Sequence, residues 1–149
     1  MTEDDFQVDR MDNVTLFVPD RYEAAQWLEE VLGLEIRPEY EEWAADEEGP
    51  LMISPGSGKT MLAVCKEQPE QSNEVDIHQH IAFRVDGDKF LQFLDRIEEL
   101  SLTDADGEPV TKDDIIDFHL SFAIHFHDPY GNQFELTTYD YQSVETALN

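Results

Sequence analysis

The sequence predicts an α+β fold in which a β-α-β-β-β unit occurs twice, forming cupped mixed sheets with helices on their outer faces. Two strand–helix openings of the same layout begin at Asn13 and His80, and short strand-like runs follow each. Of the 149 residues, 40% are hydrophobic, which suffices for one domain with a buried core. We expect repeat one at about 10–66, a linker at about 67–77 and repeat two at about 78–141.

The first repeat opens with a strand over residues 13–18, where apolar and polar side chains alternate. A helix follows it, with Asp20 as N-cap, Glu23 three residues later as the partner in a capping box, and Gly33 as the stop. Pro and Gly then divide the chain into strand-like runs at 34–43, 51–54 and 60–65.

The second repeat opens with an alternating strand over residues 80–85 and a helix capped by Asp86 or Asp88. Residues 128–131 read Asp-Pro-Tyr-Gly, with Pro and Gly where a type I turn favours them, so they predict a tight hairpin. The strands of this hairpin are expected at 118–126 and 132–139, after a surface loop at 102–114 that encloses a short strand near Val110.

The charge indicates an environment rather than an activity. Asp and Glu number 35 against 9 Lys and Arg, which gives a net charge of −26, and the acids are spread along the chain. Such a surface repels nucleic acid. It is typical of a salt-rich cytoplasm, where molar salt screens self-repulsion over about 3 Å. No apolar run is long enough for a membrane span, and the N-terminus lacks signal-peptide features, so we expect a cytoplasmic protein.

Strand alternation also predicts which polar side chains share one surface. Phe134 and Leu136 belong to the face that packs on a helix, so Glu135 points to the opposite, concave face. The same rule places four more polar side chains on that face: His80, Arg84, His125 and His127. Imidazoles and a carboxylate from neighbouring strands are therefore expected to converge.

Three segments carry a resemblance to a known family: FHDPYGNQFELTTY, MDNVTLFVPDRYEAAQWLEEVLGLEI and HQHIAFRVDGDKFLQFLDRIEEL. They resemble, respectively, the final hairpin and the two strand–helix openings of the vicinal oxygen chelate superfamily. That superfamily includes glyoxalase I, extradiol dioxygenases, and fosfomycin- and bleomycin-resistance proteins. The resemblance covers nearly all of residues 10–141.

The resemblance implies a divalent metal, Fe, Mn, Zn or Ni, bound by His80 and Glu135. Asn13 stands where the first repeat of metal-using members commonly has a His ligand, and Leu62 where it would have a counterpart of Glu135. An amide oxygen is a weak ligand for such metals. Asn13 or His125 could complete the ligand set, and His125 could instead act as the catalytic acid–base residue.

Other roles remain open for several of these residues. Phe17, Arg84 and His127 are candidates for substrate binding. Alternatively, Phe17 is a packing residue, Arg84 pairs with a buried Glu135, and His127 hydrogen-bonds the hairpin turn.

Two classes of function fit the sequence best, and a third, weaker possibility is a structural domain with no ligand. The first is a metal-dependent dioxygenase or lyase/isomerase that acts on a small oxygenated substrate. The second, favoured by Asn13 and Leu62, is a metal-free binding protein of the drug-sequestering type. In either case we expect a homodimer, because sheet edges are rarely left bare.

Overall fold

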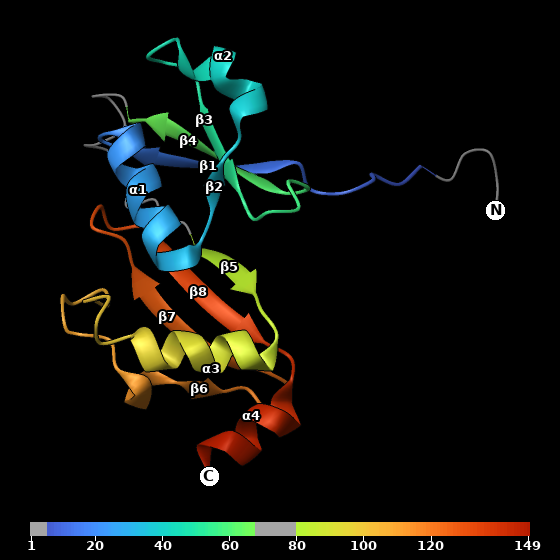
Figure 1. The fold of residues 1–149 in the computed structure, drawn as a ribbon, viewed down its shortest axis with the longest axis vertical. Coiled ribbons are helices and arrows are strands. Elements are labelled where there is room, and N and C mark those ends of the chain that lie inside the picture. Colours follow the sequence, from blue (N-terminus) through green and yellow to red (C-terminus); the bar gives the residue numbers. More distant parts are fainter. Residues whose placement is uncertain (1–5, 68–79) are drawn as a thin grey trace. The chain divides into compact units, whose positions relative to one another are not determined.

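The computed structural model describes residues 6–67 and 80–149, so the expected linker lies almost wholly outside the described residues (Figure 1). The chain forms two compact units, Met1–Val75 and Asp76–Asn149, and each contains one four-stranded mixed sheet. The expected α+β class with a repeated βαβββ unit is confirmed. None of the helices in the described ranges is both long and apolar enough to cross a bilayer.

The first unit has the strand order β1-β4-β3-β2, with β1 and β4 parallel and the other pairs antiparallel. Its elements are β1 (Asn13–Val18), α1 (Arg21–Leu32), β2 (Glu35–Ile36), η1 (Pro38–Tyr40), α2 (Glu41–Ala44), β3 (Leu51–Ser54) and β4 (Met61–Lys66).

Helix α1 begins and ends where the sequence predicts. Asp20 accepts hydrogen bonds from the backbone N–H groups of Tyr22 and Glu23, and Gly33 ends the helix with a φ of 69°. The left-handed region favours glycine, which has no Cβ. The apolar stripe of α1 is buried: Ala24, Ala25, Leu28 and Val31.

The strand-like interpretation of residues 34–43 is wrong beyond Ile36. Pro38 starts the 3₁₀ turn η1, and α2 follows at once, because a proline with its fixed φ suits the first turn of a helix. Two aromatic side chains of the expected strand, Tyr40 and Trp43, stack on each other instead, with ring centroids 4.8 Å apart.

The second unit repeats this plan with the strand order β5-β8-β7-β6, in which β5 and β8 are parallel. Its elements are β5 (His80–Arg84), α3 (Gly87–Arg96), η2 (Lys112–Asp114), β6 (Ile116–Asp117), β7 (Phe122–His127), β8 (Gln133–Thr138) and α4 (Tyr141–Leu148). Asp86, one of the two predicted caps, accepts a hydrogen bond from the Lys89 backbone N–H and caps α3.

The structure corrects three expectations in this unit. The strand expected at 118–126 begins only at Phe122, because residues 118–121 turn back to β6, with His119 at a φ of 71°. Val110 is buried but lies outside a strand; nearby, Thr103 forms isolated bridges with Pro109 and His127. Helix α4 was not expected.

The predicted turn at 128–131 closes the β7–β8 hairpin. The buried Asp128 carboxylate accepts hydrogen bonds from Tyr130 N–H, Asn132 N–H and the Asn132 side-chain amide, and Gly131 takes a φ of 94°. Burial is the largest influence on this carboxyl and raises the pKa of Asp128.

We predict that the carboxyl of Asp128 makes stability fall as pH rises. Its folded-state pKa lies above the ordinary value of about 3.8, so its contribution to the free energy of unfolding is complete below that value and is lost as pH rises through the folded-state pKa. The unfolding free energy of the wild type minus that of Asp128→Asn should therefore decrease between about pH 3 and pH 6 in urea titrations.

The control for this experiment is Asp104→Asn. Asp104 accepts two backbone N–H bonds in an exposed turn, so this variant also removes one carboxylate from a hydrogen-bonded turn. A wild-type advantage over Asp128→Asn that grows with pH, beyond that of the control, would show that hydrogen bonding outweighs burial at Asp128.

Candidate metal centre

One face of the second sheet carries the polar side chains predicted to converge, and we call it the histidine face. In the strand register, Ala82 lies beside Glu135, and His125 lies beside Glu135 on its other side. The histidine face comprises His80, Ala82, Arg84, Ala123, His125, His127, Gln133, Glu135 and Thr137.

Helix α3 covers the opposite face of this sheet. Phe93 of α3 lies 5.6 Å from Phe126, measured between ring centroids, and Phe126 lies between the two histidines of β7 in the sequence. Phe126 and Phe134 are fully buried. The packing of this apolar set fixes the orientation of the alternate set, so α3 holds the imidazoles and the carboxylate on the histidine face.

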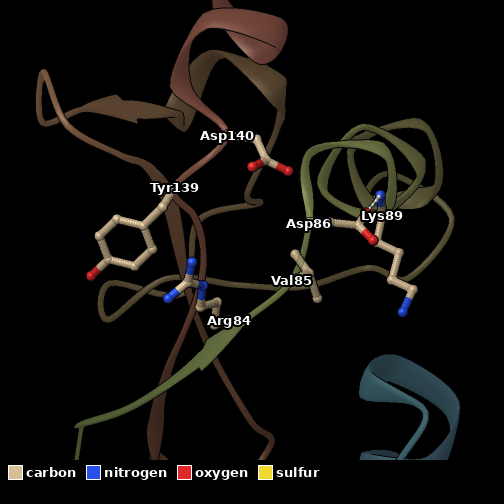
Figure 2. A pocket seen from close by; sticks show the side chains of 6 residues that line it. All are labelled: Arg84, Val85, Asp86, Lys89, Tyr139 and Asp140. Atoms are coloured by element: carbon tan, nitrogen blue, oxygen red, sulfur yellow. Dashed lines mark hydrogen bonds between the residues drawn. The ribbon is translucent and has the colours of Figure 1, made fainter.

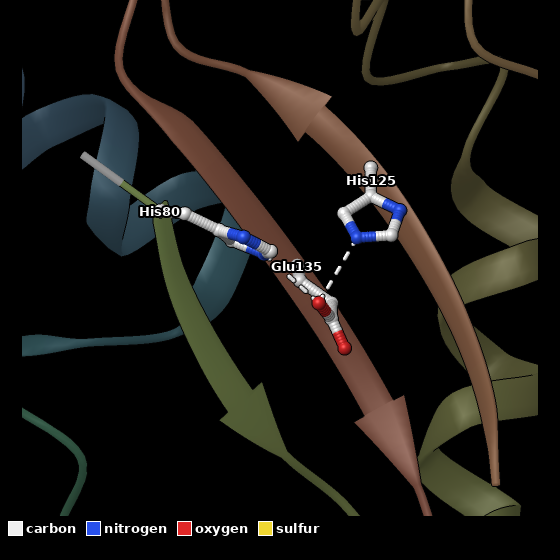
Figure 3. Close-up of side chains that lie close together, drawn as sticks. All are labelled: His80, His125 and Glu135. Carbon is white, nitrogen blue, oxygen red and sulfur yellow. Dashed lines mark hydrogen bonds and ion pairs between the residues drawn. The ribbon is translucent and has the colours of Figure 1, made fainter. Parts of the chain in front are cut away.

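His80, His125 and Glu135 form a compact cluster (Figure 3). His80 Nε2 lies 2.9 Å and His125 Nε2 lies 3.0 Å from the same oxygen, Glu135 Oε1. The rings of the two histidines meet edge to face with centroids 5.2 Å apart. The Glu135 side chain is only 16% exposed, whereas that of His80 is 45% exposed, so one side of the cluster is open.

The donor set and its spacing fit a divalent transition metal. One ligand atom from each residue lies within 4.8 Å of the others. Metal–ligand bonds of about 2.1 Å place neighbouring ligand atoms about 3 Å apart, similar to both N–O distances in the cluster. Two imidazoles and one carboxylate with open positions form the facial triad typical of non-heme Fe(II) sites.

The other histidine-face candidates lie apart from this cluster. Arg84 does not pair with Glu135, because its guanidinium lies over the Tyr139 ring, 4.6 Å from the centroid. His127 is next to Gln133 in register, and its Nδ1 is buried without a hydrogen-bond partner among the residues that the structure describes. The side-chain bonds that hold the hairpin turn come from Asp128 instead.

The remaining candidates lie in the first unit. Asn13 begins β1 and donates a hydrogen bond to Asp12 through its side-chain amide. Phe17 is half-buried on the same face of the first sheet, beside Cys65 in register. On this face Met52, Met61 and Ala63 form a buried apolar cluster covered by Tyr40.

The counterpart of Glu135 in the first repeat is Ala63, not Leu62. Glu135 lies beside the residue two positions after His80, and Ala63 lies beside the residue two positions after Asn13. Leu62 is one residue out of register and faces the other side of the sheet. The first repeat still has no carboxylate at this position, so the conclusion drawn from Leu62 is unchanged.

Sequence reasoning missed a pocket at the end of the second sheet, which Arg84 and Tyr139 line with four other residues. The available signal was the position of Tyr139, two residues after Thr137 on an alternating strand. Tyr139 contacts Arg84 because β5 pairs with β8, and the sequence pattern of either strand alone does not predict that pairing.

The fold agrees with the family comparison. The sequence matches the Glyoxalase/Bleomycin resistance protein/Dioxygenase superfamily over residues 10–136. The chain belongs to this superfamily. This match confirms the family resemblance that the two strand–helix openings and the final hairpin indicated. A comparison with curated proteins found no match to the sequence.

Solved structures of this superfamily have the same fold. Oxidase ChaP-H2 is 26% identical, with a TM-score of 0.65 and coverage of 93% of this chain and 99% of that one. The fosfomycin resistance protein FosX from Listeria monocytogenes is 16% identical, with a TM-score of 0.63 and the same two coverages. Lactoylglutathione lyase from Agrobacterium tumefaciens is 19% identical, with a TM-score of 0.60 and coverages of 91% and 97%.

Proposed function

We propose that the chain is a metal-dependent enzyme that binds a small oxygenated molecule, with one divalent metal held by His80, His125 and Glu135. The cluster of these three side chains carries the proposal. In this proposal His125 is a ligand rather than the acid–base residue. Asn13 stays a candidate for a further oxygen ligand on the basis of the superfamily pattern alone.

Metal binding requires a particular tautomer of each of the two imidazoles. Both hydrogen bonds to Glu135 Oε1 run through Nε2, which must carry a proton to donate. Ligation through Nε2 therefore requires that each neutral ring hold its proton on Nδ1 instead. Glu135 is the residue that brings the two Nε2 atoms together before the metal arrives.

Within the superfamily we favour oxidase or dioxygenase chemistry. A bound metal would supply a Lewis acid with open positions for two substrate oxygens or for one substrate and dioxygen. Ala63 offers no second carboxylate, so more positions stay open than in a four-ligand site. The name of the 26% identical structure, Oxidase ChaP-H2, also supports this branch.

Calorimetric titration tests the proposal. Metal-free protein in molar KCl would be titrated with Fe(II), Mn(II), Zn(II) and Ni(II), with oxygen excluded for Fe(II). We expect one equivalent of at least one metal to bind with a Kd of about 1 μM or lower. Uptake of less than about a tenth of an equivalent of every metal would contradict the proposal.

The second candidate function is metal-free binding of a small molecule, as in the drug-sequestering branch. Asn13 in place of a histidine favours it, as does a Glu135 carboxylate that already accepts two hydrogen bonds. Under this alternative, His80→Ala combined with Glu135→Gln leaves the affinity for the small molecule nearly unchanged.

We also propose that the chain forms a homodimer and that it works in a salt-rich cytoplasm. The edge strand β6 carries exposed Ile116, and Phe118 and Leu120 follow it, so this edge offers apolar surface. A net charge of −26 on each chain opposes association unless salt screens it.

We therefore predict that low salt weakens the dimer. Sedimentation in about 2 M KCl should show a dimer, and dilution to about 0.1 M should dissociate or unfold it, because the Debye length rises from about 2–3 Å to about 10 Å. A monomer of equal stability at both salt levels would contradict both the dimer and the adaptation to salt.

A further inference from the structure

We infer that the pocket at the end of the second sheet binds a carboxylate of the substrate, so that Arg84 determines specificity. The inference rests on the proposed function and adds the substrate class: a small molecule with two chelating oxygens at one end and a carboxylate at the other.

The pocket has a volume of about 260 Å³ (Figure 2). It lies where the parallel strands β5 and β8 end and α3 begins. Its lining residues are Arg84, Val85, Asp86, Lys89, Tyr139 and Asp140. This volume accommodates a carboxylate and a few adjoining carbon atoms, but not a large ligand.

The side chains of this pocket that still have hydrogen-bond donors to offer a ligand are the two cationic ones. Neither Arg84 nor Lys89 has a carboxylate partner within residues 6–67 and 80–149, although the chain carries 35 acidic residues. The two carboxylates in the lining are already in use: Asp86 accepts from the Lys89 backbone N–H, and Asp140 accepts from Gly87 N–H at 2.7 Å.

Arg84 is also held in a suitable orientation. Its guanidinium lies over the Tyr139 ring, which restricts the side chain while leaving its N–H groups to bind a ligand. Figure 2 shows the two side chains next to each other. A planar guanidinium fits a carboxylate with two parallel hydrogen bonds, so a carboxylate matches this pocket better than a cation does.

The histidine face connects the pocket to the metal centre. Arg84 lies four residues after His80 on β5, a separation of about 13 Å along a strand. Between them on the same face lies Ala82, which is small and exposed and therefore leaves room for the body of a ligand. A molecule of about 10 Å could reach from the metal ligands to Arg84.

Binding of 3-(3,4-dihydroxyphenyl)propanoate and its methyl ester to the metal-loaded protein tests this inference. Both probes carry two adjacent hydroxyl oxygens, and only the acid carries a carboxylate. We expect the acid to bind at least about tenfold more tightly than the ester in calorimetry. Arg84→Gln should remove this preference and Arg84→Lys should keep part of it, whereas Lys59→Gln, which removes a positive charge elsewhere, should preserve it.

The outcomes separate the inference from the proposed function. Binding of both probes with equal affinity would overturn the inference alone, as would a preference for the acid that survives Arg84→Gln. If no metal binds, 3-phenylpropanoate tests the pocket in the metal-free protein, because it has the carboxylate but no chelating oxygens. A shift of the Arg84 Nε–H NMR signal is expected at about 10 mM, and no shift would overturn the inference.

Discussion

Glu135→Gln should lower the affinity for the bound metal by at least about 100-fold, the largest functional effect that we expect from a single substitution. Glutamine keeps the size of the side chain but removes the negative charge, and its amide oxygen is a weak ligand for transition metals. Among the described residues, Glu135 is also the hydrogen-bond partner that both imidazoles share. Calorimetric titration with the tightest-binding metal measures the loss.

A surface variant controls for the general effect of removing one negative charge. Glu98→Gln makes the same substitution at an exposed position beyond α3 and should leave the metal affinity within about twofold. Circular dichroism should show that both variants remain folded. Equal metal affinities for Glu135→Gln and Glu98→Gln would contradict the role of Glu135 as a ligand.

Phe134→Ala should lower the free energy of unfolding by about 3–5 kcal/mol, the largest effect on stability that we expect. Phe134 is fully buried and immediately precedes Glu135, on the opposite face of β8. Its ring centroid lies 6.1 Å from that of Phe126 and 6.2 Å from that of Phe83. Truncation leaves a cavity between α3 and the sheet that carries the metal centre.

Phe6→Ala provides the matched comparison, because it removes the same side chain from a position that is 88% exposed. Urea denaturation should place this variant within about 0.5 kcal/mol of the wild type. If Phe134→Ala were as mild as Phe6→Ala, the assignment of Phe134 to the helix-covered face would be wrong.

Local signals in the sequence were sufficient to predict the framework of the fold. Asp20, Gly33 and the turn at 128–131 depend on contacts within a few residues, so they could be predicted without knowing the pairing of strands. Helices α2 and α4 could not be predicted in this way. Helix α2 is one turn long after Pro38, and α4 buries only Val144, so neither gives a clear apolar period.

The alternation of side chains along each strand was sufficient to predict the candidate site. The wrong assignment of Leu62 arose because the register between paired strands was not known. Alternation placed His80, His125 and Glu135 on one face because each lies on a strand whose other face is apolar. Whether Leu62 or Ala63 corresponds to Glu135 depends on how β1 pairs with β4, and a slip of one residue moves a side chain to the other face. Contacts between strands decide such questions, and the pattern of one strand does not contain them.

A crystal soaked in Mn(II), with data collected on both sides of the Mn absorption edge, tests the central claim most directly. We predict one anomalous peak at about 2.0–2.3 Å from Nε2 of His80, Nε2 of His125 and a carboxylate oxygen of Glu135, with the hydrogen bonds among them broken. The contradicting result is no peak at this position while Glu135 Oε1 still accepts a hydrogen bond from both imidazoles.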